Sequence, residues 1–215
     1  QVRQTGHTIT FEGEHDSYTR AHAWVREQIE KNTLFSFDYN GVAYDQHISS
    51  WNKTVTTTPN GWTVTYQNGD VVAWSEITFD PETNSVEWTN HFKNNGKSTS
   101  PVISNIRALN SSFSIADPVL TGANGSTATE TDFQPFSVDL TQTTSHTMQT
   151  AGGRSSQGAF PYFDIGNGEY GIMGAIGWTG NWSANFKNSN GNVAIDAGMQ
   201  KTNIALYAGE QMRTP

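Results

Sequence analysis

Hydrophobic and polar residues alternate with a period of two along most of the chain, a pattern typical of half-buried β-strands. The alternation is clearest in three successive runs, residues 62–66, 72–78 and 86–92. Short polar turns at residues 68–70 and 80–84 separate these runs. We therefore expect the three runs to form an antiparallel meander.

The same alternation returns in most of the remaining sequence. The further strands that it predicts lie at residues 35–39, 102–109, 113–115, 136–140, 160–165, 168–178, 182–186, 193–197 and 203–208. Residues 120–132 lack periodicity and are expected to form a long exposed loop, and residues 141–157 are a second polar stretch. Residues 17–31 carry their apolar side chains roughly on one face of a helix. Because no repeat or proline-rich linker interrupts the chain, the pattern predicts one large all-β domain, a two-sheet β-sandwich with few short helices.

Composition agrees with this fold class and excludes several functions. Of the 215 residues, only 15% are charged; the net charge is −8, and no basic run is present. Because phosphate binding needs clustered Lys and Arg, we expect no nucleic-acid partner. No apolar stretch approaches the ~20 residues of a membrane helix, so we expect no membrane partner. The absence of cysteine removes disulfides and thiolate chemistry, and the Lys-poor, Asn- and Thr-rich composition favours a secreted or extracytoplasmic protein.

The residues that could carry catalysis are scattered along the chain. Glycoside hydrolysis needs two carboxylates facing each other, ~5–10 Å apart. The acidic residues sit mostly in predicted turns, where capping of the backbone explains them: Asp70, Asp80, Glu82, Asp132, Asp164 and Glu169. The histidines show no metal-binding spacing: His7, His15, His22, His47, His91 and His146. We therefore expect no catalytic residue, no metal and no cofactor within the chain.

Tryptophans are the best candidates for ligand contacts, because an indole ring can stack on the apolar face of a sugar. Three of them lie on successive strands of the meander, which favours packing in the core or on its far face: Trp62, Trp74 and Trp88. Trp178 and Trp182 instead flank the turn at residues 179–181. A tryptophan beside glycine and asparagine in a turn is a better candidate for the rim of a ligand site.

The last third of the chain has a familiar order of short motifs. It reads GGRSSQGAFPYF at residues 152–163, GEYGIMGAIGWTGNW at 168–182 and LYAGEQMRTP at 206–215. This order resembles the end of the N-terminal domain of family-36 glycoside hydrolases, the α-galactosidase type. Residues 34–41, followed by Trp51, also look like the start of that domain in one branch of the family. One departure is Gln157, which stands where a histidine often follows the Ser-Ser pair.

The resemblance implies a β-supersandwich over residues 1–215 and a following catalytic (β/α)8 barrel that is absent from the chain. In such enzymes the barrel performs retaining hydrolysis of terminal α-galactosides, or transfer to another sugar, so the isolated chain is expected to be inactive. The domain would pack on the barrel, help to shape the substrate entrance and contribute oligomer contacts in the full-length protein. Arg154, Trp178, Asn181 and Trp182 are the residues expected to lie near the barrel or the sugar.

Two other functions are compatible with the same residues. A stand-alone carbohydrate-binding module would need a working sugar site without a barrel. A mutarotase-like sugar enzyme would need a histidine and an acid converging on one face of the sandwich, which the scattered histidines do not suggest.

Overall fold

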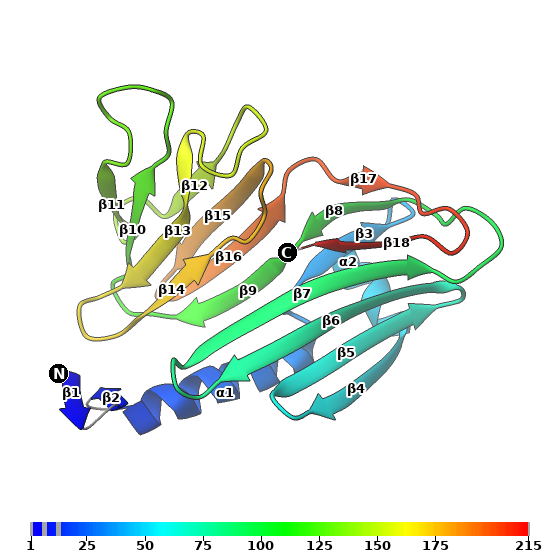
Figure 1. Ribbon diagram of the computed structural model, residues 1–215, viewed down its shortest axis with the longest axis horizontal. Helices are drawn as coiled ribbons and strands as arrows, with labels where there is room; N and C mark the ends of the chain where they lie inside the picture. Colours follow the sequence, from blue (N-terminus) through cyan, green and yellow to red (C-terminus); the bar gives the residue numbers. More distant parts are fainter. Residues whose placement is uncertain (1, 6–7, 12–13, 215) are drawn as a thin grey trace.

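Two hydrophobic cores organise the structure, and each is enclosed by its own sheets (Figure 1). The computed structural model describes residues 2–5, 8–11 and 14–214, with side chains described from residue 20 onward. All paired strands in these ranges are antiparallel. The predicted all-β class is confirmed, although the described strands are divided among five sheets rather than two.

A five-stranded meander forms the largest sheet and closes one side of the first core. Its strands, in spatial order, are β18 (Gln211–Thr214), β7 (Ser85–Asn94), β6 (Val71–Asp80), β5 (Gly61–Asn68) and β4 (Asn52–Thr58). The three predicted runs are therefore confirmed as β5, β6 and β7. Alternation decides which face is buried: Ala73 and Ile77 have almost no exposed surface, whereas Glu76 between them is exposed.

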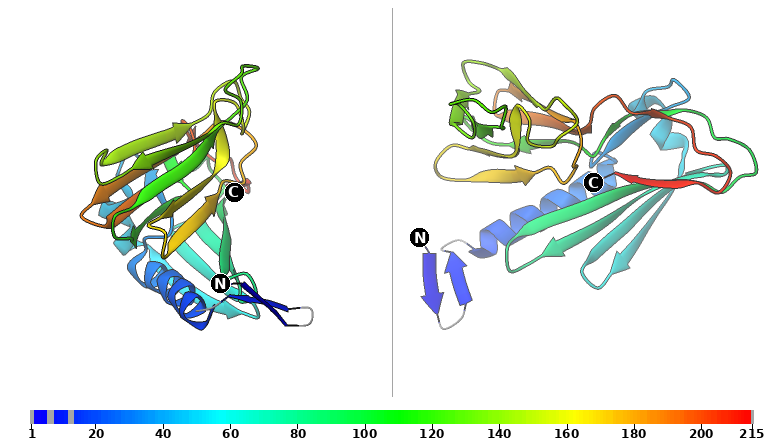
Figure 2. Two further views of the ribbon diagram at one scale, coloured as in Figure 1. Left: turned by 90° about the vertical axis from the view of Figure 1, so that its left-hand side faces the viewer. Right: turned by 45° about the horizontal axis from the view of Figure 1, so that its top comes forward.

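A helix and a small sheet pack against the buried face of this meander (Figure 2). They are α1 (Glu14–Lys31) and the three strands β17 (Asn203–Ile204), β8 (Ile103–Arg107) and β3 (Ser36–Tyr39). The short helices α2 (Tyr44–His47) and η1 (Ile48–Ser50) follow β3, and the hairpin of β1 (Val2–Thr5) and β2 (Thr8–Phe11) precedes α1. Phe35, Phe37 and Phe92 meet at the centre of this first core, each about 1% exposed or less.

The helix predicted at residues 17–31 is confirmed as part of α1. Its side chain Val25 is wholly buried in the first core. The helix ends where Asn32 takes a φ of 59° and the N–H of Thr33 donates to the carbonyl of Gln28 at 3.0 Å, a geometry that satisfies an unpaired carbonyl of the last turn. Among the described residues, no helix combines the length and the apolarity that a membrane crossing requires.

Two four-stranded sheets stack face to face around the second core. One contains β11 (Pro135–Asp139), β10 (Val119–Asn124), β13 (Ala159–Gly166) and β14 (Gly171–Ala175). The other contains β12 (Ser145–Gln149), β15 (Trp182–Ser189), β16 (Asn192–Met199) and β9 (Leu109–Ser114). Phe163 from the first sheet and Phe186 from the second meet edge to face, with ring centroids 4.9 Å apart.

Two segments expected to be irregular contain strands. Residues 120–124, expected to begin a long loop, belong to β10 in the middle of a sheet, and residues 145–149 form β12 at an edge. The reason is close packing by small residues, because a Cβ placed on Gly122 would lie 2.6 Å from Cζ of Phe136. Residues of low strand propensity are accommodated here by their neighbours on the sheet.

The chain passes from the first core to the second where β8 runs into β9 through Ala108. The carbonyl of Ala108 accepts a hydrogen bond from Nε1 of Trp88 at 2.7 Å. Strand β16 approaches the crossing so closely that a Cβ placed on Gly198 would lie 2.8 Å from the nitrogen of Ala108. The two cores therefore meet at this crossing through the side chain of Trp88 and the close backbone approach of β16.

Candidate functional site

Three of the four predicted ligand-facing residues, Arg154, Trp178 and Asn181, lie on two loops of the second sandwich. These rim loops are residues 150–158, between β12 and β13, and residues 176–181, between β14 and β15. Oδ1 of Asn181 accepts a hydrogen bond from the N–H of Gly153 at 2.8 Å, so the two loops are joined directly. The carbonyl of Asn181 also accepts from the N–H of Gln200 at 3.1 Å, which ties the turn to the end of β16.

Trp182 is part of the core rather than of the exposed rim. As the first residue of β15 it faces inward, and its side chain has no exposed surface. Its Nε1 donates to the carbonyl of Ser155 at 2.7 Å, and its backbone N–H donates to Oγ1 of Thr150 at 2.9 Å. Burial leaves no face of the ring for a ligand, so the expectation of a direct contact is corrected for this residue. Trp182 instead holds the loop that contains Arg154.

The other three predicted residues lie at or near the surface. Arg154 is exposed, whereas Trp178 and Asn181 are half-buried. Trp178 folds down on its own turn, because a Cβ placed on Gly180 would lie 2.7 Å from its Nε1. The loop around Arg154 bends through Gly153, whose φ of 78° suits glycine. The structure therefore joins Asn181 to the loop of Arg154, and contact of these residues with a substrate stays a prediction.

A pocket of about 440 Å³, lined mainly by residues with polar side chains, opens beside the rim loops, where strands from both cores meet. Sequence reasoning missed it, because its walls come from segments about a hundred positions apart. The residues around it are Ser104, Asn105, Arg107, Gln149, Ser183, Met199, Gln200, Lys201 and Thr202. Gln200 connects the pocket with the rim loop at residues 176–181, since it lines the pocket and its Nε2 donates to the carbonyl of Trp182, directly after that loop, at 2.7 Å.

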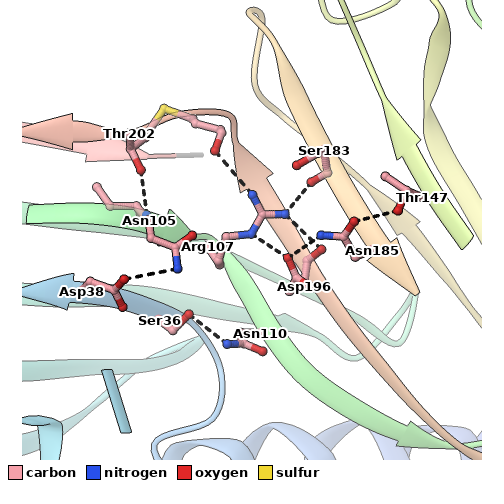
Figure 3. A network of polar contacts seen from close by, with 12 residues as sticks. Ser36, Asp38, Asn105, Arg107, Asn110, Thr147, Ser183, Asn185, Asp196 and Thr202 are labelled. Atoms are coloured by element: carbon pink, nitrogen blue, oxygen red, sulfur yellow. Dashed lines mark hydrogen bonds and ion pairs between the residues drawn. The ribbon is translucent and has the colours of Figure 1, made fainter. Parts of the chain in front are cut away.

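Arg107 joins the two cores at this pocket (Figure 3). Its Nη2 donates to the carbonyl of Ser183 at 2.8 Å and to that of Asp196 at 3.2 Å, and its Nε lies 2.8 Å from Oδ1 of Asp196. Burial lowers the pKa of the Arg107 guanidinium, and the charge of Asp196 opposes that shift. Asp196 also accepts from Asn185 at 3.0 Å, and Asn185 accepts from Thr147 at 2.9 Å, so the network reaches β12.

The opposite wall of the pocket is held in an uncommon backbone conformation. Asn105 and Lys201 have φ values of 48° and 53°, in the left-handed region, which residues other than glycine occupy at a cost in free energy. Thr202 stabilises it, because its Oγ1 accepts from the N–H of Ile106 at 2.7 Å and its carbonyl accepts from the N–H of Asn105 at 3.1 Å. No carboxylate lines the pocket, so the acid and base of glycoside hydrolysis are not found there.

One histidine converges with an acid on a sheet face, contrary to the expectation from the sequence. On the outer face of the five-stranded sheet, the rings of His91 and Trp74 stack with centroids 4.7 Å apart and planes 7° apart. Nε2 of His91 lies 3.5 Å from Oε2 of Glu76, and Oε1 of Glu76 accepts from Nε1 of Trp74 at 3.2 Å. The histidine and the acid are in contact, which leaves no room for a sugar ring between them.

Two further tryptophan candidates and one histidine candidate pack in or against the first core. Trp62 and Trp88 pack against the first core, one of the two placements expected for them. His47 lies in the same core among aromatic rings, and its Nε2 is 3.0 Å from the carbonyl of Phe37. Among the side chains described from residue 20 onward, no three His, Asp or Glu residues come together as a metal site would need.

No protein-family model matches the chain, and no curated protein matches its sequence. Solved structures match it as a fold, and those similar to it include α-galactosidases. One is the GH36 α-galactosidase AgaA from Geobacillus stearothermophilus, with a TM-score of 0.61 and 14% identity over 85% of this chain. Another is the α-galactosidase from Lactobacillus brevis, with a TM-score of 0.64 and 12% identity over 85% of this chain.

The likeness extends over a limited part of those enzymes. The chain spans 29% of the Geobacillus protein and 28% of the Lactobacillus protein. At these identities the comparison shows the fold. The sequence-based resemblance to family-36 glycoside hydrolases is thus confirmed at that level: the chain has the fold of a domain that forms less than a third of such an enzyme.

Proposed function

We propose that this chain is the non-catalytic N-terminal domain of a family-36 glycoside hydrolase that acts on α-galactosides. Residues 1–215 would form one unit, followed by a catalytic barrel on which the domain packs. The observation that carries the proposal is the fold match over 85% of the chain to less than a third of two α-galactosidases. The order of motifs from residue 152 to residue 215 supports it independently.

The rim loops would help to shape the substrate entrance. Arg154 is exposed, and Asn181 is braced by Gly153 and Gln200. Trp182 fixes the first loop from below through its hydrogen bond to Ser155. Exposed polar groups on loops that a rigid scaffold positions are suited to contact a ligand or a neighbouring domain.

The chemistry would belong to the barrel. The pocket beside the rim lacks a carboxylate, and Glu76 and His91 contact each other instead of flanking a ligand space. We therefore expect the isolated chain to be inactive on α-galactosides and the full-length protein to hydrolyse them.

The sequence of the gene beyond the codon for Pro215, together with an assay of its product, tests this proposal. We expect an alternating strand–helix pattern to follow, and a full-length product that releases p-nitrophenol from p-nitrophenyl α-galactoside. In that product, Trp178→Ala should raise KM severalfold in a protein that still folds, with some loss of melting temperature because Trp178 packs against the second core. The distant exposed control Val55→Ala should change neither quantity. A gene without a following barrel, or an inactive full-length product, would contradict the proposal.

A stand-alone carbohydrate-binding module is the second candidate. One observation favours it: aromatic side chains gather on an exposed sheet face, where they serve neither core.

A further inference from the structure

The outer face of the sheet formed by β10, β11, β13 and β14 carries exposed aromatic side chains. On β13, Phe163 and Ile165 point into the second core, so Tyr162 and Asp164 point outward. Tyr162 is 51% exposed, and Met173 on the neighbouring strand β14 is 79% exposed. Large apolar groups that gather on a surface mark an interaction site.

Three of these rings form a continuous row, which we call the aromatic ridge: Phe133, Phe160 and Tyr162. Phe160 and Tyr162 stack with centroids 5.2 Å apart and planes 28° apart. Phe133 meets Phe160 edge to face, with centroids 5.9 Å apart, and is 55% exposed. Each ring packs against the next, so the three rings present one contiguous aromatic surface.

Phe133 holds its place at a conformational cost. Its φ is 58°, an outlier for a bulky residue, and burial does not compensate for this strain. The preceding residue, Asp132, fixes the loop: its carboxylate accepts from the hydroxyl of Ser126 at 2.7 Å and from the backbone N–H groups of Thr127 and Ala128 at 2.8 and 3.1 Å. A strained and exposed ring on a braced loop indicates a functional constraint.

Hydrogen-bonding groups lie directly beside the ridge. Asp164 follows Tyr162 on the same face, and none of the described residues donates a hydrogen bond to its carboxylate. Partial burial raises the pKa of this carboxyl group. Thr121 is its cross-strand neighbour on β10, and the hydroxyl of Thr121 lies 3.4 Å from that of Ser137 on β11. The carboxylate of Asp164 and the hydroxyls of Thr121 and Ser137 therefore lie on the same sheet face as the rings.

This set of groups matches one ligand chemistry. The outward positions of the four strands carry Asp139 and Asp164 and no Lys or Arg, so an anionic ligand has no cation to meet. A wholly apolar partner would leave the carboxylate of Asp164 without a donor. A neutral sugar suits both the rings and the carboxylate of Asp164, because its C–H face stacks on a ring while its hydroxyls donate to the carboxylate.

We propose that the aromatic ridge, together with Asp164, is a binding site for neutral saccharides, which adjoins the rim loops but uses side chains other than Trp178 and Asn181. Tyr162 and Phe160 supply the stacking surface, Phe133 extends it, and Asp164 accepts hydrogen bonds from sugar hydroxyls. The proposal does not depend on the assignment to an α-galactosidase, because binding is measured on this chain without any hydrolysis.

The test is calorimetric titration of the 215-residue chain with melibiose, raffinose, cellotetraose and maltotetraose. We expect at least one saccharide to bind, and Tyr162→Ala to weaken its affinity about tenfold or more. Phe133→Gly should weaken it as well without disturbing the fold, because glycine accepts a φ of 58° readily. Asp164→Ala should also weaken it, since the hydrogen-bond acceptor is lost. The matched control is Tyr207→Ala, which removes a 71% exposed ring elsewhere and should leave the affinity unchanged.

Three outcomes would overturn the proposal. The first is a wild-type chain that binds none of the four saccharides. The second is binding that survives Tyr162→Ala and Phe133→Gly but is lost in Trp178→Ala, which would place the sugar at the rim loops. The third is sugar-independent dimerisation in sedimentation experiments that Phe133→Gly abolishes, without saccharide binding, which would make the ridge a contact with a second copy of the chain.

Discussion

The guanidinium of Arg107 lies 2.8 Å from the carboxylate of Asp196, and this ion pair joins the end of β8 to the middle of β16. The side chain of Arg107 is 10% exposed. Its remaining hydrogen bonds go to backbone carbonyls, including those of Ser183 and Asp196. One buried cation therefore satisfies acceptors from two strands of the second core while it belongs to a strand of the first.

Arg107→Ala should lower the free energy of unfolding by about 2–3 kcal/mol, because two carbonyls lose a charged donor, whereas Asp196 is 37% exposed and keeps the hydrogen bond from Asn185. Arg107→Lys should lie between this variant and the wild type, since an ammonium lacks the planar fork of donors. Urea unfolding measures both. Arg154→Ala, which removes an exposed arginine, serves as the control and should change stability by no more than about 0.5 kcal/mol. A loss below about 1 kcal/mol for Arg107→Ala would show that the pair does not hold the cores together.

Stability should fall as the pH is lowered through the ordinary range of histidine, because His47 is buried as the neutral form. Its Nε2–H donates to the carbonyl of Phe37, and burial lowers its pKa below the ordinary 6.5. The unfolded chain takes up a proton near pH 6.5, whereas the folded chain does so at lower pH. The contribution of His47 is therefore complete above about pH 7 and decreases as the pH falls below 6.5 towards the folded-state pKa.

Urea unfolding of wild type and His47→Gln at pH 8, 6.5 and 5.5 isolates this effect. The variant should be less stable at pH 8, and its stability should fall less between pH 8 and 5.5. Equal decreases in the two proteins would assign the pH dependence to other groups.

The loop that carries Phe133 should depend on one carboxylate. Asp132 accepts hydrogen bonds from the hydroxyl of Ser126 and from three backbone N–H groups, and these bonds lower its pKa to about 2. The carboxylate contributes fully to loop order above pH 3.8, the ordinary pKa that it has in the unfolded chain. Its contribution decreases as the pH falls below 3.8 and is lost as the pH falls through about 2. At pH 6, Asp132→Ala should speed amide exchange at Thr127 severalfold.

Two comparisons sharpen this prediction. Asp139→Ala removes a similar turn carboxylate, which accepts from Thr141, and should affect exchange only near that residue. Asp132→Ala should also weaken saccharide binding at the aromatic ridge if the loop positions Phe133. Unchanged exchange at Thr127 in Asp132→Ala would show that the loop is held by other contacts.

Trp182→Phe should loosen the rim loop around Arg154. The change removes the hydrogen bond to Ser155 and part of a buried ring, at a cost of about 2–4 kcal/mol. Trypsin should then cleave after Arg154 faster than in the wild type, as peptide mass spectrometry would show. Trp88→Phe is the matched control, because the indole of Trp88 makes a similar hydrogen bond at the crossing between the cores. Equal acceleration in both variants would indicate general destabilisation rather than local loosening.

Local periodicity predicted the elements whose burial follows from their own sequence. The meander of β5 to β7 alternates strictly, and α1 has a clear apolar face around Val25, so both were predictable. The strand at residues 120–124 was missed, because small residues such as Gly122 form a strand only when a neighbour such as Phe136 packs over them. That information lies in tertiary contacts.

The candidate site was predictable only in part, for two physical reasons. Trp182 was correctly expected to begin a strand, but its burial depends on the loop at residues 150–158, which packs over it and which no local pattern places there. The pocket around Arg107 depends on the pairing of β8, β15 and β16, which no local pattern reveals. The aromatic ridge did leave a signal: residues 160–165 are apolar on both faces of a strand, although the core needs only the face of Phe163 and Ile165.

The two cores also differ in how the polypeptide supplies them. All strands around the second core come from the uninterrupted stretch 109–199, whereas the first core needs Leu206 and Met212, which follow that stretch in the sequence. During synthesis from the N-terminus, the sandwich of residues 109–199 is therefore complete before the sheet that precedes it in sequence. The meander and α1, which are synthesised earlier, therefore cannot complete the first core until residues 206–212 have followed the second sandwich.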